Sequence, residues 1–308
     1  MEVRPPEPDS QLCADTGVRE ETQGKITMRI NHATAIVALL GLACSSGVSQ
    51  AMTSTTPPDG NGHPAAVALL RSDGYWARPF CSGMLLSDKV VATASHCLEF
   101  AVRLQQAGWQ LAVTNDATLQ QDSAGWLPIS TLTTNAPFGQ IVLNPAYDPK
   151  VLGGYDHDVS AVVLSTPVSV DPAAFPALPT MGLLDELKAS GYLRDATFSV
   201  LGYGIVEKPT STHGKWVSTF SGERRIGTLG FFALDKRFIH ESQRLHQGQD
   251  GACNGDSGGP SLLQIGSTTY LVGVTSAGDI PCYATNTATR TDTDDALALL
   301  MEVLDENP

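Results

Sequence analysis

Hydrophobic residues in this chain occur in short runs that polar or turn-forming residues separate. The runs occupy positions 65–70, 89–93, 140–144, 159–164, 197–201 and 269–275. Most of them are rich in Val, Ile or Thr and have Gly, Pro, Asn or Asp close by, which is typical of β-strands. The pattern therefore predicts an all-β fold without internal repeats.

Apolar residues with helical spacing are found mainly near the C-terminal end, where they predict a helix over 292–305. The members of this stripe are Leu297, Leu300, Met301 and Leu304. Thr293 and the two aspartates that follow it can cap and charge the first turn. A second, shorter helix is predicted over 182–187.

The first 51 residues are interpreted as lying outside the folded domain. Arg29, the largely apolar run 33–43 and the small residues up to Ala51 predict an export signal peptide over 28–51. Residues 1–27 are polar, and we interpret them as a disordered extension or a misassigned start. A buried helix at 33–43 is one alternative. Lipid attachment at Cys44 is another, although Gly41 stands where a lipidation motif has a leucine-like residue.

The composition excludes some classes of function. A chain of 308 residues that is 42% hydrophobic, with 29 glycines and 19 prolines, suits a loop-rich globular protein of one or two domains. No apolar stretch is long enough to predict a transmembrane helix, so no membrane association is expected after signal removal. The net charge of −13 disfavours nucleic-acid binding, because an acidic protein repels phosphates.

The most informative motif is the hexapeptide Gly-Asp-Ser-Gly-Gly-Pro at 255–260, where glycines flank Ser257 and permit a sharp turn. A serine hydroxyl is a poor nucleophile unless a base activates it. The motif also fits the Gly-x-Ser-x-Gly elbow of esterases. That fold requires a histidine after the serine, and none follows His246. In isolation the motif would be a glycine-rich surface turn.

Two further segments supply a histidine and an acid. One is Thr-Ala-Ser-His-Cys, which ends at His96 and Cys97, and the other is Asp158 followed by the apolar run 159–164. Taken in the order His, Asp, Ser, the three motifs resemble the chymotrypsin-like serine proteases, or trypsin family, over about 64–304. Ser95 replaces an alanine of the family's pattern.

The resemblance implies a fold and its boundaries. It implies a trypsin-like domain over 52–308, built from two six-stranded antiparallel β-barrels with the active site in the cleft between them and a C-terminal α-helix. The first barrel would cover about 58–170 and the second about 196–290. The segment of about 171–195 would link them.

The resemblance also implies a serine endopeptidase in which His96 takes the proton of Ser257 and Asp158 orients the imidazole. Backbone N–H groups of Gly255 and Ser257 would form the oxyanion hole. Asp156 competes for the acid role, because strand alternation would place it on the same face as Asp158. Asp158 is preferred because it adjoins the apolar run. A catalytically silent binding or regulatory protein on the same fold is the alternative.

A specificity pocket is implied at five positions. They are Gly251, Ala252, Ser276, Gly278 and Ala288. Trypsin-like members that select Lys or Arg carry an aspartate six residues before the serine, whereas this chain has Gly251 there and Asp250 one residue too early. The expected P1 residue, whose carbonyl is attacked, is therefore large and uncharged, such as Phe, Tyr, Leu or Met. Asp250 and Asp279 are interpreted as solvated loop acids.

Four of the six cysteines lie beyond the predicted signal peptide. Their spacing lacks the paired Cys-x-x-Cys of zinc sites, and no His-Glu-x-x-His occurs, so neither a metal nor a cofactor is predicted. The resemblance implies two disulfides, Cys81–Cys97 and Cys253–Cys282.

In the family, a new N-terminal amine pairs with the aspartate before the serine, here Asp256. The usual Ile-Val-Gly-Gly terminus is absent, and counting back from 64–70 places the terminus near Met52, which cleavage after Ala51 would release. The expectation is a secreted monomer (extracellular, or periplasmic in a bacterium) that export itself activates. It would act on protein or peptide substrates and would be open to protein protease inhibitors.

Overall fold

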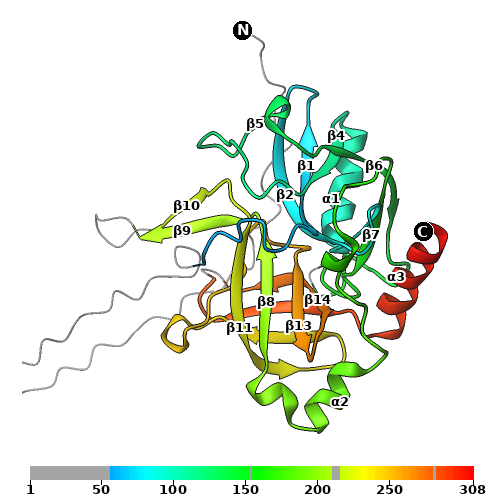
Figure 1. Cartoon of the computed structure of the whole chain (residues 1–308), viewed down its shortest axis with the longest axis vertical. Coiled ribbons are helices and arrows are strands. Elements are labelled where there is room, and N and C mark those ends of the chain that lie inside the picture. Colours follow the sequence, from blue (N-terminus) through cyan, green and yellow to red (C-terminus); the bar gives the residue numbers. More distant parts are fainter. Residues whose placement is uncertain (1–55, 153, 210–215, 280–281) are drawn as a thin grey trace, which may run out of the picture. The chain divides into compact units, whose positions relative to one another are not determined.

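A computed structural model describes residues 56–308, except for 153, 210–215 and 280–281. The predicted extension at 1–27, the predicted signal peptide at 28–51 and the expected terminus Met52 lie outside the described residues. The described part contains two β-barrels, a separate two-stranded hairpin and three α-helices (Figure 1).

The first barrel is a closed antiparallel sheet of six strands in the order β1-β4-β6-β7-β3-β2, with a short β5 added beside β2. Its strands are β1 (Ala66–Ser72), β2 (Trp76–Leu85), β3 (Val90–Thr93), β4 (Gln110–Thr114), β5 (Leu127–Pro128), β6 (Ala136–Val142) and β7 (Ser160–Leu164). Every residue of β1, β3 and β7 is buried. This explains why these strands read as continuous apolar runs rather than as alternating ones.

The second barrel is also closed and antiparallel, with the order β11-β12-β15-β14-β13-β8. Its strands are β8 (Thr197–Gly202), β11 (Arg225–Leu234), β12 (Phe238–Ser242), β13 (Pro260–Ile265), β14 (Thr268–Gly278) and β15 (Thr285–Arg290). A separate hairpin, β9 (Ile205–Pro209) with β10 (Trp216–Phe220), follows β8. The expected pair of six-stranded antiparallel barrels is thus confirmed.

Three α-helices accompany the barrels. The helix α3 (Asp294–Glu306) ends the chain, as expected, and buries Ala296, Leu300 and Val303 in the same apolar cluster as the first barrel. The short α2 (Leu183–Ala189) lies between the two barrels in sequence. None of the helices among the described residues is long and apolar enough to span a membrane.

The sequence pattern does not predict α1 (Ser95–Gln106), which begins two residues after β3 ends. Its buried face includes Leu98, Ala101 and Leu104, which recur every three residues. Glu99 and Arg103 on the exposed side form an i,i+4 ion pair at 2.6 Å. The apolar stripe is narrow, and the histidine motif at its start obscured the helical spacing.

Candidate active site

The geometry of His96 is set by the start of α1. The first N–H groups of a helix have no partner within the helix, and the N-cap residue Ala94 offers no side chain to accept from them. Asp158 fills this role, because its Oδ1 accepts from the backbone N–H of His96 at 2.8 Å. The same carboxylate reaches the ring, with Oδ2 at 2.7 Å from His96 Nδ1.

The two side chains of this pair differ in their exposure to solvent. Asp158 is fully buried, whereas 25% of the His96 side chain is exposed. A carboxylate accepts, so Nδ1 carries the proton in this pair, and in the neutral imidazole Nε2 is then the nitrogen with the lone pair. The ring of Tyr155 meets the imidazole edge to face at 5.6 Å between centroids. Asp158 and Tyr155 therefore hold the His96 ring in place, and Nε2 remains available.

Asp156 takes a different position from Asp158. Its Oδ1 lies 2.5 Å from Arg237 Nη1, and no contact joins it to His96 among the described residues. The intervening His157 has φ +53°, and β7 begins only at Ser160. The expectation that strand alternation places both aspartates on one face is therefore wrong, because the backbone turns between them.

The segments on either side of His96 and Asp158 are also joined. Ser95 Oγ donates to His157 O at 3.2 Å and lies 2.7 Å from Ser160 Oγ. The His157 ring in turn places Nδ1 at 2.7 Å from Asp295 of α3. Ser95, where the chain departs from the family's alanine, thus adds a polar link between the two segments.

Ser257 lies in a loop that depends on its glycines. Gly255 has φ +95° and Gly258 has φ +81°, which side chains other than glycine rarely adopt. A Cβ on Gly258 would also clash with Ser82 and Thr93. Within the described part of the chain, the N–H groups of Gly255 and Ser257 make no hydrogen bond. The loop therefore carries two unpaired donors, one on the serine itself and one two residues before it.

The serine loop and the histidine lie close together. Cys97 Sγ is 3.6 Å from His96 Nε2 and 3.6 Å from the carbonyl oxygen of Ser257. No hydrogen bond joins Ser257 Oγ to His96 Nε2 among the described residues, although such bonds are often long in structures without substrate. The structure thus brings His96, Asp158 and Ser257 into one region.

Both disulfides that the resemblance implies are present. Cys81 is joined to Cys97, with the Cα atoms 6.2 Å apart, and Cys253 is joined to Cys282, with the Cα atoms 5.4 Å apart. The ligand atoms of Cys81, His96 and Cys97 lie within 4.8 Å of one another, which could suggest a metal site. Because the two sulfurs are bonded to each other, they offer no thiolate to a metal.

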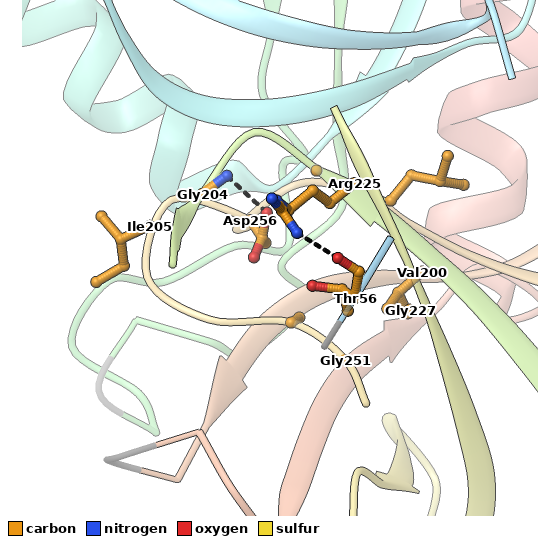
Figure 2. Close-up of a pocket in the computed structure, with 11 residues that line it drawn as sticks. Thr56, Val200, Gly204, Ile205, Arg225, Gly227, Gly251 and Asp256 are labelled. Atoms are coloured by element: carbon orange, nitrogen blue, oxygen red, sulfur yellow. Dashed lines mark hydrogen bonds between the residues drawn. The ribbon is translucent and has the colours of Figure 1, made fainter. Parts of the chain in front are cut away.

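Asp256 faces a pocket beside the serine loop, together with Arg225 and Thr56 (Figure 2). Its carboxylate accepts from the N–H groups of Gly204 and Cys253, both at 2.8 Å. Burial of the carboxyl raises the pKa of Asp256 to about 6, although these hydrogen bonds and the charge of Arg225 lower it. Arg225 Nη1 donates to Thr56 O rather than to Asp256.

The expected pocket residues occupy three different places in the structure. Gly251 and Ala252 lie in the buried segment before Cys253, and Ser276 and Gly278 lie at the end of β14. Ala288 is fully buried in the core of the second barrel. Ala288 pairs with Thr275 across β14 and β15, and Asn286 pairs with Gly278 after a register shift between Thr275 and Ala277.

The two loop acids near this region bind backbone amides. Asp250 Oδ1 accepts from Thr228 N at 3.0 Å. Asp279 accepts from the N–H groups of Tyr283, Ala284 and Thr285. Burial opposes ionisation of Asp279, but these hydrogen bonds outweigh it and lower its pKa. Both acids therefore organise their loops instead of being simply solvated.

Three buried polar residues near the expected pocket were missed by the sequence analysis. They are Glu241, Gln243 and Asn286. Burial raises the pKa of Glu241 to about 7, although hydrogen bonds from Ser261 and Asn286 lower it. Ile239, Glu241 and Gln243 stand two residues apart in and just after β12, so the spacing of the two polar residues from a buried isoleucine was the one available signal.

Comparison with known proteins matches a family model described as Trypsin to residues 52–296. Serine protease ea of Drosophila melanogaster is 24% identical over 217 residues, which cover 66% of this chain and 54% of that protein. Spaetzle-processing enzyme of the same fly is 27% identical over 220 residues (66% and 52%). Phenoloxidase-activating factor 3 of Holotrichia diomphalia is 27% identical over 232 residues (71% and 62%). The chain spans between half and two thirds of the length of these relatives.

Proposed function

The chain belongs to the trypsin family of serine proteases, and from this premise we propose that it is a secreted serine endopeptidase. The observation that carries the proposal is the pairing of His96 Nδ1 with the fully buried Asp158 at 2.7 Å. A buried carboxylate that fixes one imidazole nitrogen leaves the other as a base, which an enzyme of this class requires.

In the proposed reaction, His96 Nε2 takes the proton of Ser257 Oγ as that oxygen attacks a peptide carbonyl. The imidazolium that forms is stabilised by Asp158, and it then returns the proton to the leaving amine. Water hydrolyses the acyl-enzyme by the same route in reverse. The unpaired N–H groups of Gly255 and Ser257 are proposed to stabilise the oxyanion, an effect typically worth ~3–4 kcal/mol for one donor.

For the substrate, we propose a large uncharged P1 residue. The acids that could attract a P1 cation are engaged, since Asp250 and Asp279 bind backbone amides. Gly251 and Gly278 have no side chains that would fill the pocket. Gly251 and Ala252 are proposed as its floor, with Ser276, Gly278 and Ala288 along its walls.

Activation is proposed to follow from export. Thr56, four residues after Met52, lines the pocket that holds Asp256. Four extended residues span up to ~13 Å, and we propose that this segment brings the Met52 amine to the carboxylate. We propose that residues 28–51 are removed as a signal peptide, and that the trypsin-like domain over 52–308 acts as a monomer on protein or peptide substrates, with protein protease inhibitors as further partners.

A non-catalytic binding protein on the same fold is the second candidate. Distant relatives at 24–27% identity leave room for it, whereas the paired His96 and Asp158 favour the enzyme. The deciding experiment incubates the purified mature chain with a peptide library beside its Ser257→Ala variant. Cleavage by the parent alone supports the endopeptidase. Cleavage by neither, from folded protein with both disulfides intact, supports the binding protein.

A further inference from the structure

Gln243, which directly follows β12, is a buried polar side chain without a partner. It is fully buried, and neither its Oε1 nor its Nε2 makes a hydrogen bond among the described residues. Its backbone N–H donates to Ala284 O at 3.0 Å, so the main chain is satisfied and only the amide is not. A buried polar group left unpaired costs about 1–3 kcal/mol. Such an amide requires an explanation.

The amide of Gln243 lies against the segment that leads to Ser257. A Cβ built on Gly251 would come within 2.7 Å of Gln243 Oε1 and would clash with Leu229. Gly251 stands six residues before Ser257 and has no side chain of its own. Gln243 therefore supplies the polar group at a place where residue 251 supplies none.

The neighbouring side chains continue this polar lining. Asn286 pairs with Gly278 across β14 and β15, and with Glu241 across β12 and β15. Its Nδ2 donates to Glu241 Oε2 at 2.8 Å, while Glu241 Oε1 accepts from Ser261. Both oxygens of Glu241 are thus engaged. Among the described residues, both polar atoms of the Gln243 amide remain buried and unpaired beside this cluster.

We propose that Gln243 is the specificity-determining residue of the protease site, and that the site takes a P1 side chain ending in a carboxamide, as in glutamine. The inference rests on the proposed function and refines its uncharged P1 residue. A carboxamide can donate to Oε1 and accept from Nε2, so it satisfies both atoms at once. A hydrocarbon side chain of the same length leaves both unpaired, which is the situation in which enzymes discriminate strongly.

A charged P1 residue is disfavoured on the same grounds. A P1 lysine or arginine would need a free carboxylate, and Glu241, Asp250 and Asp279 already bind other donors. A P1 glutamate would lie near Glu241 and the amide Oε1, where no cation compensates it among these residues. Among these P1 head groups, the carboxamide is the one that needs no group of opposite charge.

The test uses four peptides of identical sequence whose P1 residue is Gln, Met, Glu or Lys, which have similar lengths. We expect kcat/KM for Gln to exceed that for Met at least tenfold, with Glu and Lys lower still. In Gln243→Leu, which retains the volume but removes the amide, Met should be preferred over Gln. The control is Gln247→Leu, the same change at an exposed position of the following loop, and it should leave the preference unchanged.

Labelling of Ser257 by a fluorophosphonate without a P1 group is measured in every variant. Three results would each overturn the inference. They are equal or better cleavage of the Met peptide by the parent, an unaltered Gln-to-Met ratio of kcat/KM in Gln243→Leu, and labelling without cleavage of any peptide. The proposed function itself fails only if the parent neither cleaves a peptide nor reacts with the probe. Normal labelling of Gln243→Leu shows that the variant has folded.

Discussion

Ser82, on strand β2 of the first barrel, donates its backbone N–H to the carbonyl oxygen of Ser257 at 2.8 Å. The Ser82 side chain reinforces this link, because its Oγ donates to Gly255 O at 3.2 Å and accepts from Tyr203 N at 3.1 Å. One residue of the barrel that carries His96 therefore holds the loop that carries Ser257. The relative placement of histidine and serine depends on this junction.

Ser82→Ala tests the junction. Removing Oγ takes one hydrogen-bond partner each from the Gly255 carbonyl and from the buried N–H of Tyr203, which should lower the free energy of unfolding by about 1–3 kcal/mol. If the loop shifts enough to lose ~1.4 kcal/mol of transition-state stabilisation, kcat falls about tenfold with little change in KM. Thermal unfolding and peptide kinetics measure the two effects. Ser165→Ala, on the exposed surface of the first barrel, should change neither, and an unaffected kcat in Ser82→Ala would contradict the prediction.

Asp158→Asn is expected to lower kcat by about 10⁴-fold, because an amide does not fix the His96 tautomer that leaves Nε2 as the base. Asp156→Asn is the matched control, two residues away in sequence. The variant alters the contact between the buried Asp156 and the partly exposed Arg237, which does not involve His96, and kcat should change little. Equal losses in the two variants would show that Asp158 has no special role.

The three triad candidates can be predicted from the sequence because their signals are local. Each of the three segments places its functional residue beside residues that define its backbone, such as the glycines around Ser257 or the apolar run after Asp158. The relation of Asp156 to Asp158 could not be obtained in this way. It depends on the positive φ of His157, whose ring is hydrogen-bonded to Asp295.

The pocket residues were less accessible to sequence reasoning, since they come from strands that are distant in the chain. Ala288 was expected from the resemblance alone, whereas the position of Asn286 opposite Gly278 depends on the pairing of β14 with β15. Gln243 was not identified because a glutamine is usually exposed. Its burial follows from the closure of the barrel around β12, which no local pattern shows.

Glu241 gives the protein a specific dependence of stability on pH. Its pKa is about 7 in the folded state, against an ordinary value of 4.5. A raised carboxyl pKa means that its contribution is fully present below about pH 4.5 and is lost as the pH rises through about 7. The shift corresponds to about 3 kcal/mol. Glu241→Gln can keep both hydrogen bonds and should not show this loss.

The measurement is urea unfolding at pH 4.5 and pH 8, made in a Ser257→Ala background so that self-cleavage does not interfere. Other groups titrate equally with and without Glu241→Gln, so the difference between the two proteins isolates the one carboxyl. The free energies of unfolding of the two proteins should differ by more at pH 8 than at pH 4.5. The glutamine variant should be the more stable one at pH 8. Parallel changes in both would contradict the raised pKa.

The activation proposal predicts that the exported, active protein begins at Met52. N-terminal sequencing of the secreted material should find this residue, because its free amine is what would pair with Asp256. Asp256→Asn should then reduce kcat while export and cleavage proceed normally. A terminus well downstream of Met52, or an active protein that retains Ala51, would contradict activation by export.

The central claim is that Ser257 is a nucleophile activated by His96. Its most direct test is stoichiometric reaction of the mature, disulfide-bonded protein with a fluorophosphonate, followed by mass spectrometry of the labelled peptide. The account predicts one adduct per chain on Ser257, none in Ser257→Ala, and strongly slowed labelling in His96→Ala, which removes the base. A folded protein that remains unlabelled at Ser257 would contradict the account and identify the chain as a binding protein on a protease fold.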